Sequence, residues 1–294
     1  MELINGKQLA IDIQEEMRVE VDQWSKNGQR LPHLVAILVG DNPASASYVR
    51  NKMRSCERTG IKSTLIKENS DITEAALLKI IQQLNEDKTV DGFIVQLPLP
   101  KHISEDKVTL AIDPSKDVDG FHPTNFGLMA QGMPQYIPAT PFGMVTMLER
   151  YGIETSGKHC VVLGRSNIVG TPMSILMSRK AKIGNCTVTL THSRTKNIKE
   201  EVQRADIIVA AIGIPNFITA DMVKEGAVIL DVGINSVEDS SKKRGYRLVG
   251  DVDFDAVAPK CSFITPVPGG VGPMTVTALI MNTLKSYKKY HLNA

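Results

Sequence analysis

This chain of 294 residues has few cysteines, no long hydrophobic run and almost no excess of charge of one sign. No apolar run approaches the roughly 18 residues that a membrane span requires; the longest, around residues 207–214, has the length of a strand. With 34 basic and 32 acidic side chains the net charge is only +2, which predicts no polyanion-binding surface. Neither a membrane nor a nucleic acid is therefore an expected partner.

The cysteines are too scattered to form a redox or metal motif. Cys56, Cys160, Cys186 and Cys261 include no Cys-x-x-Cys pair and have no histidine nearby at ligand spacing. We therefore expect reduced thiols, no disulfide and no metal site. Residues 1–5 begin an amphipathic pattern without the basic and apolar regions of a secretory signal, so the expected location is the cytoplasm.

The apolar residues alternate between helical and strand spacing along the whole chain. Leu9, Ile13 and Met17 recur at helical spacing, and residues 34–39 then form an uninterrupted apolar strand. This alternation is the signature of an α/β architecture with mostly parallel sheets. The length suffices for two domains, and the prolines and glycine between residues 138 and 143 mark a crossing between them.

A glycine turn follows a strand in the second half of the chain. Residues 160–163 form an apolar strand that continues into Gly164, Arg165 and Ser166, and a helix is expected from Gly170. This order presents backbone N–H groups to a pyrophosphate, as in a Rossmann unit. Only two glycines fit the G-x-G-x-x-G spacing, and a structural turn explains the motif nearly as well. The later strands favour the Rossmann interpretation: residues 187–190, 207–211 and 228–231, the last two followed by Gly213 and Gly233.

The end of the second of these strands indicates which nicotinamide cofactor binds. An NAD site usually has an acidic residue there, whereas the 2′-phosphate of NADP requires cations and hydroxyl donors. Here the chain carries His192, Ser193 and Arg194 without an acid, and Arg165 lies in the neighbouring turn. We expect NADP rather than NAD; the alternative is a polar surface turn.

Candidate substrate residues lie in the first half. Tyr48 and Lys52 are four residues apart and share one helix face, although such a pair is most often surface packing. Gln96 ends a buried strand, and Asp119 lies in a loop bounded by Gly120. Strand ends and glycine loops are where α/β proteins hold functional side chains.

A closing run of glycine and proline precedes the last helical pattern. Its glycines let backbone approach a flat ligand, and Thr275 is expected to cap a helix that begins at about that residue. A tight strand-to-helix connection is the alternative interpretation. The run is Pro268-Gly269-Gly270-Val271-Gly272-Pro273-Met274-Thr275.

These motifs together resemble the methylenetetrahydrofolate dehydrogenase/cyclohydrolase family, in order and over nearly the whole chain. One departure is Ala139, which stands in Pro-Ala-Thr-Pro where many members have Pro-Cys-Thr-Pro, so no thiol can act there. The matching motifs are Tyr48 with Lys52, Val95-Gln96-Leu97-Pro98-Leu99-Pro100, Lys116-Asp117-Val118-Asp119-Gly120, Gly164-Arg165-Ser166, His192-Ser193, Asp231-Val232-Gly233-Ile234-Asn235, Gly250-Asp251-Val252 and the closing run.

The resemblance implies a bifunctional enzyme of one-carbon metabolism and purine biosynthesis. It would oxidise 5,10-methylenetetrahydrofolate with NADP and hydrolyse the 5,10-methenyl product to 10-formyltetrahydrofolate. Lys52 would move the proton in hydrolysis, Gln96 would hold the amine, Tyr48 would stack on the substrate and Asp119 would bind the pterin edge. The implied residues are catalytic Tyr48, Lys52, Gln96 and Asp119; substrate-binding Tyr48, Asp119, Pro268, Gly269, Gly270 and Val271; and cofactor-binding Gly164, Arg165, Ser166, Ser193, Arg194, Gly213 and Ile234.

The resemblance also implies the domain organisation. Residues 1–142 and 275–294 would form a folate-binding catalytic domain and residues 143–274 an NADP-binding Rossmann domain. The C-terminal helix would return to the first domain, the tetrahydrofolate substrate would lie in the interdomain cleft, and the protein would be a homodimer that needs no metal.

Two other functions fit parts of this pattern. Another two-domain NADP-dependent dehydrogenase, acting on shikimate or an amino acid, would explain the Rossmann half without the four side chains of the first half. A non-catalytic nucleotide-binding module would explain the fold alone.

Overall fold

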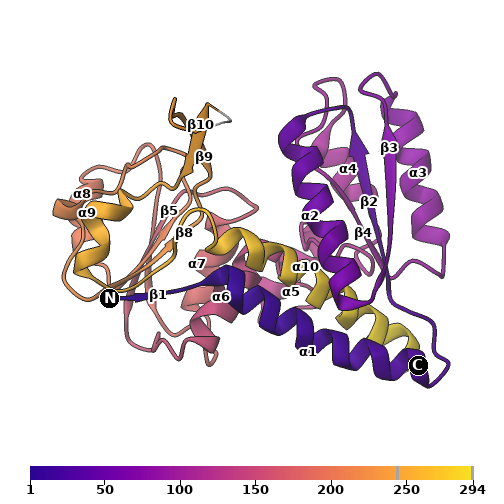
Figure 1. Cartoon of the computed structure of the whole chain (residues 1–294), viewed down its shortest axis with the longest axis horizontal. Coiled ribbons are helices and arrows are strands. Elements are labelled where there is room, and N and C mark those ends of the chain that lie inside the picture. Colours follow the sequence, from indigo (N-terminus) through magenta and orange to yellow (C-terminus); the bar gives the residue numbers. More distant parts are fainter. Residues whose placement is uncertain (243–244, 293–294) are drawn as a thin grey trace. The chain divides into compact units, whose positions relative to one another are not determined.

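The computed structural model describes residues 1–242 and 245–292, which form two compact units (Figure 1). The six-stranded unit comprises Met1–Ala10 and Thr140–Thr275, and the three-stranded unit comprises Ile11–Ala139 and Val276–Ala294. The first ten residues therefore belong with the six-stranded sheet, unlike in the division drawn from the sequence. The reason is that Glu2–Leu3 (β1) pairs with that sheet, a long-range pairing that a two-residue strand does not reveal in sequence.

The three-stranded unit is built on a parallel sheet of order β3-β2-β4. His33–Val39 (β2) is its central strand and is buried at every position, because both faces of the sheet are covered. The chain passes from β2 to Lys62–Glu68 (β3) on one side and returns to Gly92–Val95 (β4) on the other. The carboxyl ends of β2 and β4 therefore form a topological switch point, where α/β proteins bind ligands.

Helices cover both faces of this sheet. Val35 and Ile37 pack with Leu77 and Ile81 of α3 (Glu74–Glu86), while α2 (Pro43–Thr59) lies on the opposite side (Figure 1). Other helices with residues in this unit are α1 (Gly6–Lys26), α4 (Glu105–Ala111), α5 (Pro123–Ala130) and α10 (Val271–Tyr287), followed by the π-helical turn Lys288–Leu292.

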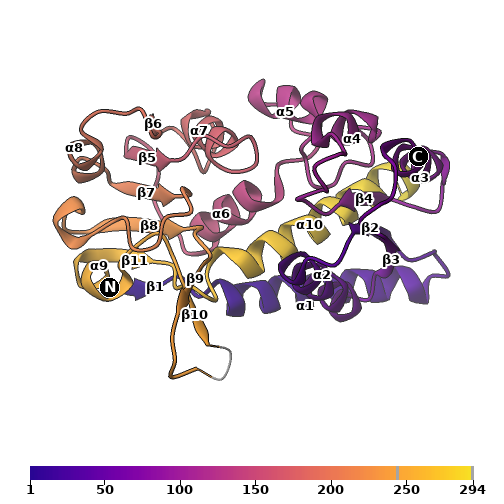
Figure 2. The ribbon, with the colours of Figure 1, turned by 90° about the horizontal axis from the view of Figure 1, so that it is seen from above.

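The six-stranded unit has the predicted Rossmann-type arrangement. Its sheet has the order β1-β11-β8-β7-β5-β6 with every pair parallel, and Figure 2 shows the strands in this sequence. The chain moves from β5 to β6 at one edge and returns to β7 on the other side of β5, which creates a second switch point. Besides β1, the strands of the sheet are His159–Leu163 (β5), Thr187–Thr191 (β6), Ile207–Ala210 (β7), Ala227–Asp231 (β8) and Cys261–Ile264 (β11). An antiparallel hairpin is formed by Asn235–Glu238 (β9) and Tyr246–Val249 (β10). The helices are α6 (Ala139–Arg150), α7 (Gly170–Ser178), α8 (Ile198–Gln203), α9 (Phe254–Val257) and the 3₁₀ turns Ala220–Met222 and Ala258–Lys260.

The closing helix begins earlier than the sequence predicts. α10 starts at Val271, inside the glycine-proline run, and Thr275 is not its cap: the Thr275 hydroxyl donates to the Val271 carbonyl at 3.3 Å. Pro273 is compatible with this start because the N–H groups of a first helical turn have no partner within the helix. Across the described ranges, 1–242 and 245–292, no helix is long and apolar enough to cross a membrane, and no His, Cys, Asp and Glu side chains group as metal ligands.

Candidate functional site

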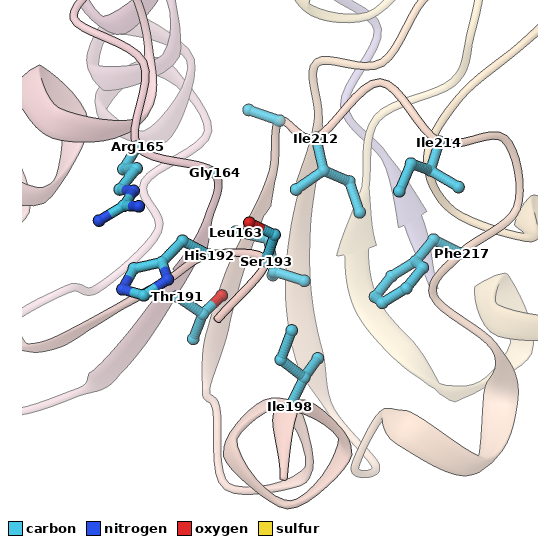
Figure 3. A pocket seen from close by; sticks show the side chains of 11 residues that line it. Leu163, Gly164, Arg165, Thr191, His192, Ser193, Ile198, Ile212, Ile214 and Phe217 are labelled. Carbon is cyan, nitrogen blue, oxygen red and sulfur yellow. The ribbon is translucent and has the colours of Figure 1, made fainter. Parts of the chain in front are cut away.

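A cavity of about 490 Å³ lies at the switch point of the six-stranded unit, at the carboxyl ends of β5, β6 and β7 (Figure 3). Arg165 and His192 lie on one side of it, and Ile212, Ile214 and Phe217 on the other (Figure 3). The Arg165 guanidinium facing an apolar wall suits a ligand with a phosphate and a flat base. The remaining lining residues are Leu163, Gly164, Thr191, Ser193, Ile198 and Ala211.

The turn after β5 brings backbone unusually close to backbone. Gly164 has φ +101°, and a Cβ there would overlap the carbonyl oxygen of Ala211; a Cβ at Gly170 would overlap the carbonyl oxygen of Gly164. The Ser166 hydroxyl accepts a hydrogen bond from the N–H of Val169 at 3.1 Å, which completes the entry to α7. The two glycines therefore have the packing role of the dinucleotide-binding turn despite their unusual spacing.

The other predicted cofactor residues differ in their relation to this cavity. Ser193 lines it, whereas Arg194 does not and donates its backbone N–H to Nδ1 of His192 at 3.1 Å. Gly213 lies between two lining residues, with φ +69°. Ile234 does not line the cavity, and its side chain is 54% exposed.

The four predicted catalytic residues all belong to the three-stranded unit. Tyr48 and Lys52 are on α2. Asn42 caps the N-terminus of this helix, because its side-chain oxygen accepts hydrogen bonds from the N–H groups of residues 44 and 45. Lys52 Nζ donates to Gln96 Oε1 at 3.2 Å and lies 5.4 Å from the centre of the Tyr48 ring. Gln96 follows β4, and its backbone N–H bonds the Ile37 carbonyl at 2.9 Å, which places the amide at the switch point.

Burial changes the acid-base properties of this group. Lys52 is 5% exposed, and loss of water lowers the pKa of its amine, an effect that the negative charge of Asp119 opposes. Burial in turn raises the pKa of the Asp119 carboxyl, and the positive charge of Lys52 opposes that shift. Gln96 holds the amine without adding a charge, so the neutral form of Lys52 becomes more accessible than in water.

The loop that carries Asp119 is organised by a second acid. Buried Asp117 accepts hydrogen bonds from the backbone N–H groups of Gly120, Phe121 and His122 and from the amide of Asn125, at 2.8–3.2 Å. Gly120 has φ +75°, and a Cβ there would lie 2.8 Å from backbone atoms of residues 137 and 138. Within the parts of the chain that the structure describes, burial and the charges of Lys52 and Asp117 act on the Asp119 carboxylate but no hydrogen bond does, so it can accept from a ligand.

The closing glycine run packs on the N-terminal segment of its own unit. Gly269 has φ +106°, and its carbonyl accepts from the N–H of Lys7 at 2.8 Å. A Cβ at Gly6 would overlap the Gly270 carbonyl oxygen, and Val271 is buried. Glycine is thus required here for backbone packing, and contact of residues 268–271 with folate stays a prediction.

Several residues of these sites were not singled out from the sequence. Asp117 appears in the sequence only as part of the motif that contains Asp119, and its four hydrogen bonds alone separate an organising acid from an available one. Ile198, Ile212 and Phe217 line the cavity but carry no sequence signal, because apolar residues after strands are ordinary in α/β proteins.

Two family models match this chain, one in each half of the sequence. Family models match residues 4–119, described as the catalytic domain of tetrahydrofolate dehydrogenase/cyclohydrolase, and residues 138–291, described as its NAD(P)-binding domain. The bifunctional protein FolD of Cytophaga hutchinsonii is 59% identical over 97% of this chain and 99% of that protein.

Solved structures agree along the full length. The bifunctional FolD enzyme of Campylobacter jejuni has a TM-score of 0.92 and 45% identity, covering 98% of this chain and 99% of that one. The Trypanosoma brucei methylenetetrahydrofolate dehydrogenase-cyclohydrolase, solved with NADP cofactor and inhibitor, has a TM-score of 0.92 and 37% identity, covering 98% of this chain and 97% of that one.

Proposed function

This chain belongs to the tetrahydrofolate dehydrogenase/cyclohydrolase family, and we propose that it catalyses two consecutive reactions. In the first, 5,10-methylenetetrahydrofolate is oxidised with NADP to the 5,10-methenyl cation. In the second, that cation is hydrolysed to 10-formyltetrahydrofolate. The observation that carries the proposal is the Lys52–Gln96 pair at a sheet switch point, because it provides a buried amine held by an uncharged partner.

The cavity of the six-stranded unit fits NADP. Gly164 and Ser166 form the turn that offers backbone to the pyrophosphate, and Arg165, Ser193 and Arg194 would hold the 2′-phosphate. The absence of an acid after β6 favours NADP over NAD. When bound, NADP supplies the hydride acceptor of the oxidation. The chain's own contribution to that step is rigid placement.

In the hydrolysis, Lys52 moves protons. Its neutral amine takes a proton from the water that attacks the methenyl carbon, and the resulting ammonium returns one to N5 as the bond from that carbon to N5 breaks. The formyl group then remains on N10, and one proton is released overall. Burial and the positive charge of the substrate both favour the neutral amine at the start.

Asp119 and Tyr48 would bind the folate. The amino-pyrimidinone edge of a pterin presents adjacent N–H donors, which one carboxylate can accept together, and Asp119 has its acceptor capacity available. Tyr48 offers an aromatic face beside Lys52. Both residues would therefore act in substrate binding and affect the two reactions alike.

The setting of the enzyme also belongs to this proposal. We infer a cytoplasmic homodimer that acts in one-carbon metabolism and supplies purine biosynthesis. The family membership supports this inference.

Two assays on the purified chain test the proposal. With tetrahydrofolate, formaldehyde and NADP, ultraviolet absorbance should report reduced nicotinamide, and added methenyltetrahydrofolate should lose its absorbance faster than in buffer. Reduction of NADP with shikimate or an amino acid instead would identify a different dehydrogenase. NADP binding without either reaction would identify a binding module.

A further inference from the structure

Two sequence motifs have no role in the chemistry above, yet they meet beside the cofactor cavity. They are residues 231–235, which begin at the last residue of β8, and residues 250–252, which follow β10. Each contains a buried acid: Asp231 is 4% exposed and Asp251 is fully buried. Buried carboxylates are costly unless hydrogen-bonded, so their partners indicate what they hold.

The Asp251 side chain bonds the cavity wall. Its Oδ2 accepts from the backbone N–H groups of Ile212 at 2.7 Å and Gly213 at 3.0 Å, and its Oδ1 accepts from the Asn235 amide at 3.0 Å. A Cβ at Gly233 would overlap Oδ1 of Asp251, so glycine is needed for the carboxylate to fit.

The backbone around Asp251 bonds the other end of the same loop. The Gly250 carbonyl accepts from the N–H of Asn216 at 3.2 Å, and the Asp251 carbonyl accepts from the N–H of Ile218 at 2.9 Å. Residues 212–217, which include three lining residues of the apolar wall, are therefore held at both ends by residues 250 and 251.

Asp231 fixes Asp251 in turn. Its carboxylate accepts from the N–H groups of Gly233, Asp251 and Val252 at 2.9–3.0 Å. A Cβ at Gly250 would overlap Asp231 Oδ2, which explains the glycine before Asp251.

We propose that Asp251 is a positioning residue for the cofactor cavity, which holds the 212–217 loop in the shape that receives NADP. The proposal rests on the proposed NADP site and assigns Asp251 no contact with the cofactor. The two hydrogen bonds that Asp251 Oδ2 accepts from the backbone N–H groups of Ile212 and Gly213 are the essential ones, because they act on the wall directly.

Substitution of the full-length protein tests this role. Asp251→Ala should raise the NADP dissociation constant, measured by calorimetry, about tenfold or more, since two buried N–H groups lose their acceptor. Asp251→Asn, whose amide oxygen can still accept both, should stay within about threefold of the wild type. Cyclohydrolase activity without NADP should persist in both variants, and Asp255→Ala, at an exposed acid on α9, should leave NADP binding unchanged.

Amide hydrogen exchange in the wild-type protein without NADP gives a second readout that needs no variant. The Ile212 and Gly213 amides should exchange slowly, and the amide of Ile214, for which the described structure shows no acceptor, should exchange fast. Equal, fast exchange at all three would overturn the proposal. Unchanged NADP affinity in Asp251→Ala would do the same, as would joint loss of NADP binding and cyclohydrolase activity in both Asp251 variants. Failure of the wild type to bind NADP would refute the cofactor assignment itself.

Discussion

In the six-stranded unit the candidate site is shaped mainly by backbone, whereas in the three-stranded unit it is made of side chains. Close backbone approach at Gly164 and Gly170 forms the turn beside the cavity, and the backbone N–H groups of residues 212 and 213 donate to the Asp251 carboxylate. Lys52 and Gln96, by contrast, meet through their side chains. Substitutions in the six-stranded unit should therefore alter cofactor binding and stability, and those in the three-stranded unit should alter the reactions and folate binding.

Lys52→Met should distinguish the functions of the two units most strongly. Cyclohydrolase activity should fall about 100-fold or more, because proton transfer by a positioned side chain contributes roughly 10²–10⁴ in rate. NADP affinity should be retained. The assay follows loss of methenyl absorbance, corrected for the uncatalysed rate, with Lys79→Met on the exposed side of α3 as the matched control. Near-normal hydrolysis would remove Lys52 from the mechanism.

The buried acid Asp231 should give the six-stranded unit a pH-dependent stability. Burial raises the pKa of Asp231 to about 6, above its value in the unfolded chain. The folded state therefore binds this proton more tightly, and the stabilisation present at low pH is lost as pH rises through about 6. The upper limit of the stabilisation that protonated Asp231 contributes is about 3 kcal/mol.

Denaturant unfolding of the wild type and Asp231→Asn over this pH range measures the effect. The wild type should lose stability relative to the variant as pH increases. Parallel pH profiles for the two proteins would contradict the assignment.

Asp119→Asn tests whether the three-stranded unit contains a binding residue as well as a proton carrier. An amide keeps one acceptor and presents a donor to the pterin donors, so both activities should fall together by about 10- to 100-fold. Folate affinity should fall in parallel. Both activities would be measured on one preparation; selective loss of hydrolysis with unchanged folate affinity would transfer the base role from Lys52 to Asp119.

Gly170→Ala tests the backbone construction of the cavity. Its Cβ would overlap the Gly164 carbonyl, so unfolding free energy should fall by about 2 kcal/mol and NADP binding should weaken. Gly127→Ala on α5 is the control, since a Cβ there has no neighbour within 4 Å and should be neutral or slightly stabilising. Equal stability of the two variants would show that the turn tolerates a side chain.

Arg165→Ala combined with Arg194→Ala should have the smallest effect, confined to cofactor choice. Each cation opposite a phosphate contributes on the order of 1 kcal/mol, so loss of both should weaken NADP binding about 30-fold while NAD binding changes little. Titration with both cofactors measures this difference. Equal losses would mean that these side chains do not contact the 2′-phosphate.

Much of this arrangement could be predicted from local patterns. Periodicity predicts the apolar strands at 34–39 and 160–163 and the α2 helix where the structure has them. The spacing of apolar residues is a local property of the sequence. The predicted start of α10 was wrong, and the pairing of β1 was not predicted. A helix that begins within glycine and proline, and a strand of two residues, both depend on contacts with distant parts of the chain.

By itself the sequence determined the α/β class and the glycine turn, because these are matters of residue type and spacing. It also offered candidates, which stay predictions: the residues after β6 for cofactor choice and, through the family resemblance, the four catalytic side chains. Only the tertiary structure separated Asp119 from Asp117, buried Lys52 against Gln96 and brought the Asp251 carboxylate to backbone N–H groups 38 and 39 residues away in the chain. The physical reason is that the sequence gives the identity of a carboxylate or an amine but not its surroundings. Its exposure to water, its hydrogen-bond partners and therefore its proton affinity depend on what the fold places around it.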